Sequence, residues 1–397
     1  MATLVLHPRQ GHRCLSGHAW VFRSEFTVPA GLEDGAVVDV ADHRGRFIGR
    51  GLYSASSQIA VRLFTRNDEA LDEAFLIRRL RAAVDYRRSI WDRPCRRLVA
   101  SEADQLPGLI IDAYHDRLVV QATTVGIDRR LDLILELLRS FLHPSQIVER
   151  NDLPVRKLEG LPERSGVRFG PPETTLMAQL GAATSAIDLA DPHKTGAYLD
   201  QQASHLAVGT WIPRKNARIL DVCCHLGGFA IHALLAGAAS AIAIDSSPAA
   251  IVGTRRSAEL SGVADRLTAI EADAFTWLRA ASDRSATSDP TSQFDLILLD
   301  PPAFARNKAA VAGARRGYKE LHVRALRLLA PGGVLASWTC SHHVGPEDFL
   351  SIILDAAADT GRTMRLERTV GASPDHPVLP AVPETRYLTG FVLSALE

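Results

Sequence analysis

The sequence lacks the features of a membrane protein and of a disulfide-rich secreted protein. No apolar run approaches about 18 residues, the length that a membrane-spanning helix needs. The 5 cysteines are odd in number and form no C-x-x-C pair, which argues against a disulfide framework or a zinc ribbon. No basic segment with a long apolar core follows Met1, so we expect no signal peptide. These absences favour a cytoplasmic protein.

Net charge is also missing, because 45 basic side chains balance 45 acidic ones. A neutral total neither requires nor excludes a nucleic-acid partner, since it can hide a basic face. The 397 residues are enough for two or three domains.

Two common nucleotide-binding motifs do not occur. The glycine turn at residues 221–229 reads Asp-Val-Cys-Cys-His-Leu-Gly-Gly-Phe, which is neither G-x-G-x-x-G nor a P-loop. This disfavours a nicotinamide dinucleotide and any ligand that needs a phosphate cradle.

The pattern along the chain predicts three domains of an α/β protein. Residues 1–68 contain short β-like runs separated by glycine and proline turns, which is typical of a small barrel or sandwich. Residues 69–188 begin with a helix over 69–92 and continue as a mixed α/β unit. Residues 189–397 alternate strand and helix, which indicates a parallel sheet covered by helices.

Eight arginines lie between Arg78 and Arg97. Arginine matches phosphate groups bidentately, so these side chains could form a stripe that binds RNA. They could equally be the solvated face of an amphipathic helix.

Chemically useful residues follow the first five predicted strands of the last domain. They are Asp221, Asp245, Asp273, Asp300 and Cys340. In a doubly wound sheet the carboxyl ends of the strands share one edge, where ligands bind. A single Asp there is often only a helix cap, but five such positions in register predict a site.

The first three acids fit an adenosine ligand. Asp245 lies 17 residues after Gly228 (245 − 228), roughly where a second-strand acid binds ribose hydroxyls. Asp273 could accept the adenine amino group. S-adenosylmethionine (SAM) suits a fold that has no phosphate cradle.

The fifth strand end predicts a nucleophile. Cys340 emerges from the core at the strand end, although a free cysteine is often only a small buried residue. Cys223 and Cys224 flank the glycine turn and are better interpreted as packing or cofactor-lining residues. His342 and His343 have no partners at ligand spacing, so we expect no metal.

These motifs resemble the class I SAM-dependent methyltransferases. The chain resembles more closely the ribosomal RNA large subunit methyltransferase I family, which makes 5-methylcytosine in 23S rRNA. The resemblance spans essentially the whole length. The matching stretches are 18–22, 106–109, 155–160, 193–201, 300–304, 316–319, 339–341 and 375–378.

The resemblance implies an architecture and a site. It implies an RNA-binding PUA domain with a small β-barrel (1–68), a central α/β domain (69–188) and a Rossmann-like methyltransferase domain (189–397) with strand order 3-2-1-4-5-7-6. It further implies that residues 194–201 cover the cofactor, that the protein binds 23S rRNA or a large-subunit precursor, and that it forms a homodimer. The cofactor-binding residues would be Lys194, Thr195, Tyr198, Asp200, Gln201, Asp221, Cys223, Gly227, Gly228, Phe229, Asp245, Ser246, Asp273, Ala274, Asp300 and Pro301.

The implied chemistry is methylation of cytosine at C5. The Cys340 thiolate would attack C6, and Asp300 would hold the base edge near N3 and N4. The sequence departs from the family pattern at His225, at Ala303, where the family has a basic residue, and at Gln202, where it has arginine.

Two alternatives remain open. Asp-Pro-Pro turns also serve methylation of exocyclic amines, which needs no cysteine. A protein with this fold could also be a non-catalytic RNA-binding factor of ribosome assembly.

Overall fold

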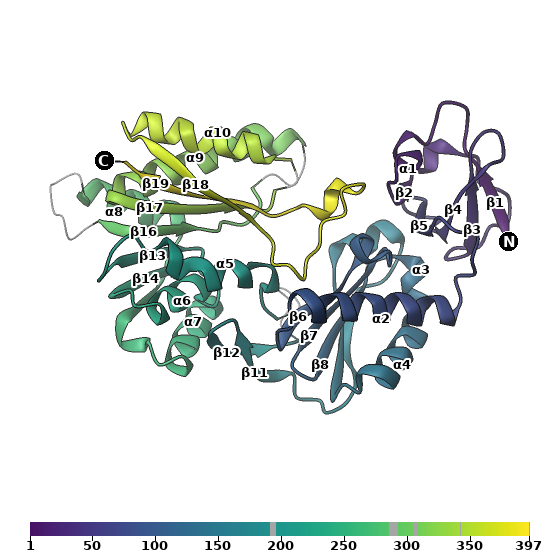
Figure 1. The fold of residues 1–397 in the computed structure, drawn as a ribbon, viewed down its shortest axis with the longest axis horizontal. Coiled ribbons are helices and arrows are strands. Elements are labelled where there is room, and N and C mark those ends of the chain that lie inside the picture. Colours follow the sequence, from purple (N-terminus) through teal and green to yellow (C-terminus); the bar gives the residue numbers. More distant parts are fainter. Residues whose placement is uncertain (191–195, 286–292, 305–307, 342, 397) are drawn as a thin grey trace. The chain divides into compact units, whose positions relative to one another are not determined.

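The computed structural model describes residues 1–190, 196–285, 293–304, 308–341 and 343–396 (Figure 1). The chain divides into two compact units. Unit 1 comprises Met1–Leu176, Asp188–Leu199 and Pro374–Thr385; unit 2 comprises Met177–Ile187, Asp200–Ser373 and Arg386–Glu397. Among the described residues, no helix has both the length and the apolar character needed to cross a bilayer.

Unit 1 begins with a five-stranded mixed sheet in the order β1-β3-β4-β5-β2. Alternating apolar residues such as Leu4, Val38 and Leu63 point into its small core. Its elements are β1 (Ala2–Val5), α1 (His12–Leu15), β2 (Trp20–Val21), η1 (Arg23–Glu25), β3 (Val37–Ala41), β4 (Phe47–Tyr53) and β5 (Val61–Thr65).

A second five-stranded sheet follows in the order β10-β9-β8-β7-β6. Helices α2 and α4 bury their apolar faces in its core. Its elements are α2 (Glu73–Ile90), β6 (Cys95–Ala100), η2 (Ser101–Asp104), β7 (Leu109–Tyr114), β8 (Arg117–Ala122), α3 (Val125–Asp128), α4 (Leu131–Leu142), β9 (Gln146–Asn151), η3 (Pro154–Glu159) and β10 (Arg164–Phe169).

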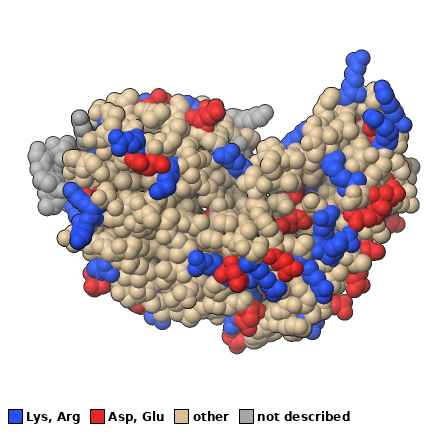
Figure 2. Space-filling model, viewed as in Figure 1, with Lys and Arg blue, Asp and Glu red and all other residues tan. Residues whose placement is uncertain are grey.

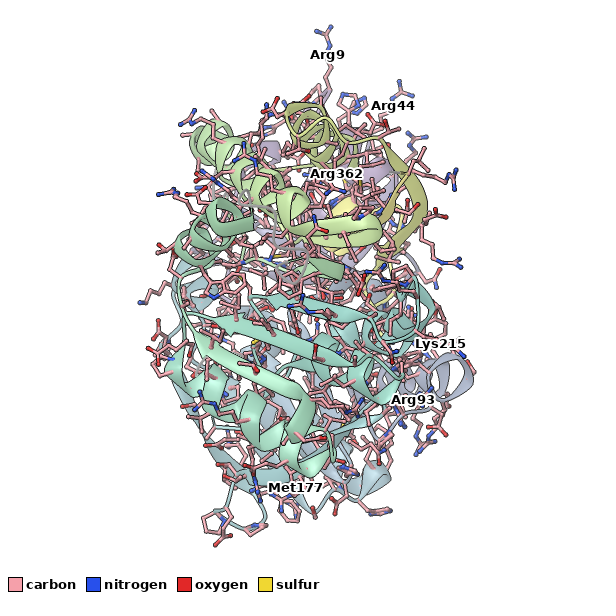
Figure 3. The ribbon with its side chains drawn as sticks, turned by 90° about the vertical axis from the view of Figure 1, so that its left-hand side faces the viewer. Arg9, Arg44, Arg93, Met177, Lys215 and Arg362 are labelled. Carbon is pink, nitrogen blue, oxygen red and sulfur yellow. The ribbon has the colours of Figure 1, made fainter. Side chains whose placement is uncertain are left out.

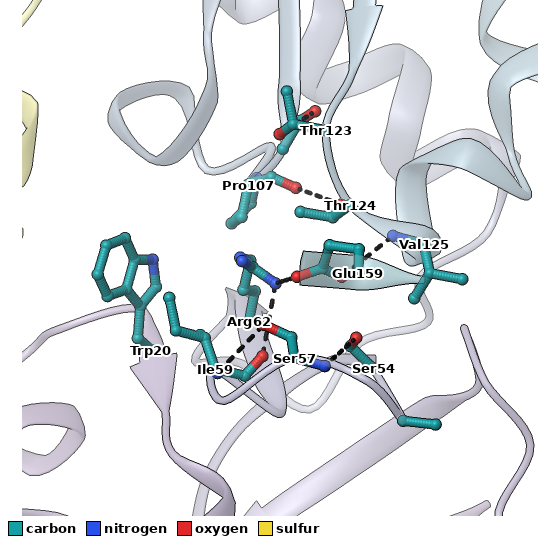
Figure 4. Close-up of polar contacts among 12 residues, drawn as sticks. Trp20, Ser54, Ser57, Ile59, Arg62, Pro107, Thr123, Thr124, Val125 and Glu159 are labelled. Carbon is teal, nitrogen blue, oxygen red and sulfur yellow. Dashed lines mark hydrogen bonds and ion pairs between the residues drawn. The ribbon is translucent and has the colours of Figure 1, made fainter. Parts of the chain in front are cut away.

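Buried polar contacts join these two sheets within unit 1. Arg62 Nη1 of β5 lies 2.8 Å from Glu159 Oε1 of η3, and Glu159 Oε2 accepts a hydrogen bond from the Val125 N–H (Figure 4). Trp20 Nε1 of β2 donates to Glu102 Oε1 at 2.9 Å. The first sheet is therefore fixed to the central one by charge-assisted bonds in addition to its own core.

Unit 2 contains a seven-stranded sheet in the order β15-β14-β13-β16-β17-β19-β18. This is the predicted order 3-2-1-4-5-7-6, with β19 antiparallel to both of its neighbours. The strands are β13 (Arg218–Val222), β14 (Ser240–Asp245), β15 (Leu267–Glu271), β16 (Phe294–Leu299), β17 (Leu329–Thr339), β18 (Met364–Gly371) and β19 (Thr389–Ala395). The strand β16 is buried along its whole length, as expected for a central parallel strand.

Helices cover both faces of this sheet, so unit 2 has three layers (Figure 1). One face carries α8 (Ala274–Ser285), α9 (Val311–Leu328) and α10 (Pro346–Asp359). The other carries α6 (Gly228–Leu235) and α7 (Pro248–Leu260). The remaining elements are β11 (Thr175–Leu180), β12 (Ala183–Asp188), η4 (Leu199–Gln201), α5 (Gln202–Ala207), η5 (Val208–Trp211), η6 (Ala264–Arg266), η8 (Lys308–Ala310) and η9 (Pro383–Thr385).

The two units do not follow the predicted boundaries throughout. The segment Pro374–Thr385 joins unit 1, although it lies between two strands of unit 2. Its Asp375 accepts a hydrogen bond from the Arg97 N–H at 2.7 Å, and the Asp375 carbonyl accepts two from the buried Arg87 guanidinium. Such contacts between residues far apart in the sequence cannot be read from local pattern.

Candidate active site

The carboxyl ends of β13, β14, β16 and β17 lie at one edge of the sheet, as predicted. Val222 pairs with Ile244 of β14 and with Leu299 of β16, and Leu299 pairs with Ser337 of β17. This register brings Asp221, Asp245, Asp300 and Cys340 to neighbouring strand ends.

Asp221 is almost fully buried at this edge. The Ala230 N–H donates to its Oδ2 at 3.0 Å, while its Oδ1 has no hydrogen-bond partner among the described residues. Burial, together with the smaller effect of the charges of Asp300 and Asp245, raises the pKa of Asp221 to about 7. A ligand that donates a hydrogen bond to the unpartnered Oδ1 would stabilise the buried carboxylate form of Asp221.

The glycine turn connects β13 to α6. Gly227 has a φ of 74°, in the left-handed region that favours glycine, and it precedes the helix as its N-cap. A Cβ on Gly228 would lie 2.4 Å from the His205 ring, so only glycine fits there. Phe229 is buried and packs on Trp338 with ring centroids 4.6 Å apart. The turn is therefore held closely against the sheet.

The two cysteines of the turn are poor nucleophiles. Cys224 is buried, with its Sγ 3.6 Å from Thr254 Oγ1. Burial and the surrounding carboxylates raise the pKa of the Cys223 thiol. Since the thiolate is the reactive form, these surroundings favour packing or lining roles for both residues.

Asp245 has both oxygens engaged by backbone groups. The His225 N–H donates to Oδ2 and the Ser247 N–H to Oδ1, each at 2.9 Å. The neighbouring Ser246 is exposed at the same edge. The backbone thus fixes the orientation of the Asp245 carboxylate without neutralising it with a cation.

Asp273 is an exposed helix cap. Its Oδ1 accepts hydrogen bonds from the N–H and the hydroxyl of Thr276, and these bonds lower its pKa. Ala274 begins α8 directly after it. The capping interpretation therefore accounts for this position, and its contact with adenine stays a prediction.

Asp300 follows β16 and contacts a residue of the predicted cofactor segment. Gln201 Nε2 donates to Asp300 Oδ2 at 2.9 Å, and Gln201 Oε1 is buried without a partner among the described residues. Pro301, which follows, is buried. Asp200, the residue before Gln201, accepts a hydrogen bond at Oδ2 from the Tyr387 hydroxyl at 2.6 Å.

Cys340 follows β17 and is partly exposed. Beside it, the buried Tyr318 hydroxyl hydrogen-bonds to the hydroxyls of Thr339 at 3.0 Å and Ser341 at 3.1 Å. Tyr318 thus holds both residues that flank Cys340. Sequence reasoning did not single out Tyr318, although it lies in the matching stretch 316–319.

Some predicted residues lie outside the described part of the chain or outside unit 2. Lys194 and Thr195 lie outside the described residues, as does His342. Tyr198 is exposed and belongs to unit 1. Of the departures from the family pattern, Gln202 is buried at the start of α5 and Ala303 is half-buried. Within the described part of the chain, no group of three or more His, Cys, Asp or Glu side chains is placed to hold a metal ion.

Known relatives share the whole length of this chain. "Ribosomal RNA large subunit methyltransferase I" of Aeromonas hydrophila is 38% identical over 402 residues, which cover 99% of each chain. The protein of that name in Aeromonas salmonicida is 39% identical over 389 residues, 96% of each chain. The chain belongs to the ribosomal RNA large subunit methyltransferase I family. This membership confirms the predicted enzyme class, a methyltransferase with SAM as cofactor, over the non-catalytic alternative.

Sequence profiles and solved structures confirm the fold class. The PUA-like domain profile matches residues 4–66, and that of RNA cap guanine-N2 methyltransferase matches residues 216–304. The structure of SMU.776, a methyltransferase complexed with SAH, has a TM-score of 0.84 at 18% identity and covers 99% of this chain and 100% of its own. A SAM-dependent methyltransferase from Streptococcus mutans has a TM-score of 0.82 at 16% identity, with the same coverage.

Proposed function

We propose that this enzyme methylates C5 of a cytosine in 23S rRNA through a covalent bond to Cys340. The observation that carries the proposal is the placement of Asp300 and Cys340 at the ends of the adjacent strands β16 and β17. Cys340 is partly exposed, whereas Cys14, Cys95 and Cys224 are buried. A thiol that must reach a substrate needs that exposure.

The strand-end residues fit SAM. The buried oxygens Asp221 Oδ1 and Gln201 Oε1 have no donor among the described residues, and the amino group of a methionine moiety supplies one. The two backbone N–H groups that orient the Asp245 carboxylate support its proposed contact with the ribose hydroxyls. When bound, SAM supplies the electrophilic methyl group. The contacts of Lys194, Thr195 and Tyr198 with the cofactor stay predictions.

C5 of cytosine is a poor nucleophile, and Cys340 and Asp300 would each activate it in a different way. The Cys340 thiolate adds to C6 of cytosine, which places electron density on C5. C5 would then take the methyl group of SAM, whose bond to the sulfonium sulfur breaks and leaves S-adenosylhomocysteine. Asp300 binds the base edge and stabilises the charge that develops in the ring. Loss of the C5 proton to a base then expels Cys340 and restores the double bond. The target base must leave its stack to reach Cys340.

The PUA-like region offers contacts for the RNA. Arg9 and Arg44 are exposed and extend away from the ribbon of the first sheet (Figure 3). Exposed arginines of this kind bind phosphates without reading sequence. The names of the relatives point to large-subunit rRNA as the substrate, and we keep the cytoplasm and a homodimer as predictions.

The test is methyl transfer from labelled SAM to unmodified 23S rRNA, with the product nucleoside identified by mass spectrometry. We expect 5-methylcytosine from the natural enzyme and none from Cys340→Ala. SAM binding by Cys340→Ala should be unchanged, which shows that the site is folded. Cys14→Ala, in the core of the first sheet, is the matched cysteine control and should remain active. Full turnover by Cys340→Ala would refute the covalent mechanism.

A second candidate is methylation of an exocyclic amine. The match of residues 216–304 to the guanine-N2 methyltransferase profile favours it. That match ends before Cys340, so it covers the strands that bind the cofactor in either chemistry. An N-methylated nucleoside in the same assay would assign the chemistry to the Asp300-Pro301-Pro302 turn.

A further inference from the structure

A pocket of about 290 Å³ lies within unit 1, between the first sheet and α2. It is near the lower end of the range of about 300–1,000 Å³ that is typical of small-ligand sites. Ala19, Arg66 and Asn67 line it from the first sheet, Arg79 from α2, Gln105 from the loop after η2, and Leu379 from the segment Pro374–Thr385. Four parts of unit 1 therefore line it, and they come from well-separated places in the sequence.

The two arginines of this pocket form no ion pair at contact distance among the described residues. Arg79 Nε is buried and has no hydrogen-bond acceptor among the described residues. Arg66 Nη2 donates to the His18 carbonyl at 3.0 Å, a neutral group. Within the described chain neither side chain forms an ion pair, and burial lowers the pKa of both. The pocket therefore holds two guanidinium groups that form no ion pair within the described chain, although the charge of Glu69 acts on Arg79.

The carboxylates near the pocket already form contacts with groups other than Arg66 and Arg79. Glu102, which also lines the pocket, accepts hydrogen bonds from Trp20 Nε1 at 2.9 Å and from the Ser101 hydroxyl at 2.6 Å. Glu69 forms its ion pair with Arg78, the residue before Arg79. An anion from outside the chain would satisfy the open donor of Arg79 and offset both charges.

We propose that Arg66 and Arg79 bind a phosphate of the RNA backbone in this pocket. The proposal rests on the function proposed above, which makes RNA the anionic partner of unit 1. The planar guanidinium groups match phosphate geometry. The site positions the RNA and carries no sequence preference of its own.

The test is filter binding of unmodified 23S rRNA to the full-length protein over a series of KCl concentrations. We expect Arg79→Gln and Arg66→Gln each to raise Kd about tenfold, as for the loss of a hydrogen bond to a charged group. Each should also reduce the slope of log Kd against log salt by about one. Arg79→Lys keeps the charge and should restore the slope but only part of the affinity.

The matched control is Arg88→Gln. Arg88 is exposed on the same helix about two and a half turns after Arg79, and thus on its opposite face. It should change neither Kd nor the slope. An unchanged slope in both Arg79→Gln and Arg66→Gln, or an equal reduction in Arg88→Gln, would overturn the proposal.

Two further arms separate this proposal from others. Millimolar inorganic phosphate should not displace the RNA; if it abolishes the difference between the natural protein and Arg79→Gln, the pocket binds free phosphate instead. Methyl transfer at saturating RNA should have an unchanged kcat in Arg79→Gln. If the natural protein transfers no methyl group and Arg79→Gln still lowers the slope, the methylation proposal fails and the phosphate site stands.

Discussion

Two charged regions of this molecule differ in whether their charged side chains form ion pairs. Around α2, acidic and basic side chains are interspersed (Figure 2), and most of the arginines are paired. Arg78, Arg87, Arg88, Arg96 and Arg97 all form ion pairs with nearby Asp or Glu. This pairing favours the structural interpretation for most of the arginine-rich stretch.

At the strand edge of unit 2, by contrast, carboxylates of like charge are grouped together. Asp221 and Asp245 form no ion pair among the described residues, and burial with the charges of Asp300 and Asp245 raises the pKa of Asp221. A fold keeps such charges unpaired at the cost of stability, and a ligand site is the usual reason. The comparison teaches that the partners of a charged residue, more than its presence, distinguish a functional cluster from a structural one.

The largest effect that we expect is the loss of the most buried ion pair of α2. Arg87 is fully buried and donates to Asp104 Oδ2 at 2.8 Å and to the Asp375 carbonyl. Arg87→Ala leaves Asp104 without its partner and should lower the free energy of unfolding by about 3–5 kcal/mol. Urea unfolding measures this. The exposed neighbour Arg88→Ala should cost less than about 1 kcal/mol, and equal costs for the two variants would end the structural interpretation of the pairing.

On the other side of the comparison, Asp300→Asn should lower the rate of methyl transfer. The variant keeps the shape of the side chain but loses the negative charge, which we expect to cost about 10²–10³-fold in kcat. Single-turnover transfer from labelled SAM to 23S rRNA measures it. Asp283→Asn replaces an exposed Asp that pairs with Arg324 and should leave kcat unchanged. A rate within twofold of the natural enzyme would remove Asp300 from the chemistry.

The smallest effect is a pH dependence that comes from Asp221. The folded state holds a proton there up to about pH 7, whereas the unfolded chain loses it near the usual value of 3.8. The folded state therefore binds more protons in this window, and stability falls as pH rises from about 4 to about 7. Between pH 5 and pH 8 the loss is at most about 3 kcal/mol.

Thermal unfolding at pH 5 and pH 8, without SAM, tests this dependence. Asp221→Asn cannot titrate, so its stability should change less between the two pH values than that of the natural protein. An equal change in the stability of both proteins would show that Asp221 is ionised at both pH values. The negative charges at the strand edge would then not raise its pKa as the comparison implies.

Much of unit 2 could be predicted because its signals are local. The strands β13 to β17 are short apolar runs, and each is followed by a polar residue or a glycine turn. In unit 1 the sequence pattern does not indicate the strands β6 and β10, because arginines interrupt their apolar residues. Arg97 of β6 pairs with Asp112, and Arg164 and Arg168 of β10 pair with Glu149, so the sheet tolerates them.

The sequence by itself determined the fold class, the family and the set of strand-end acids, because hydrophobic period and short motifs are properties of neighbouring residues. Only the tertiary structure decided which charges are compensated. Asp375 reaches Arg87 and Arg97 across nearly 300 positions, and Tyr318 reaches the residues on both sides of Cys340. Ion pairs and hydrogen bonds act over a few ångströms of space, whatever the separation along the chain.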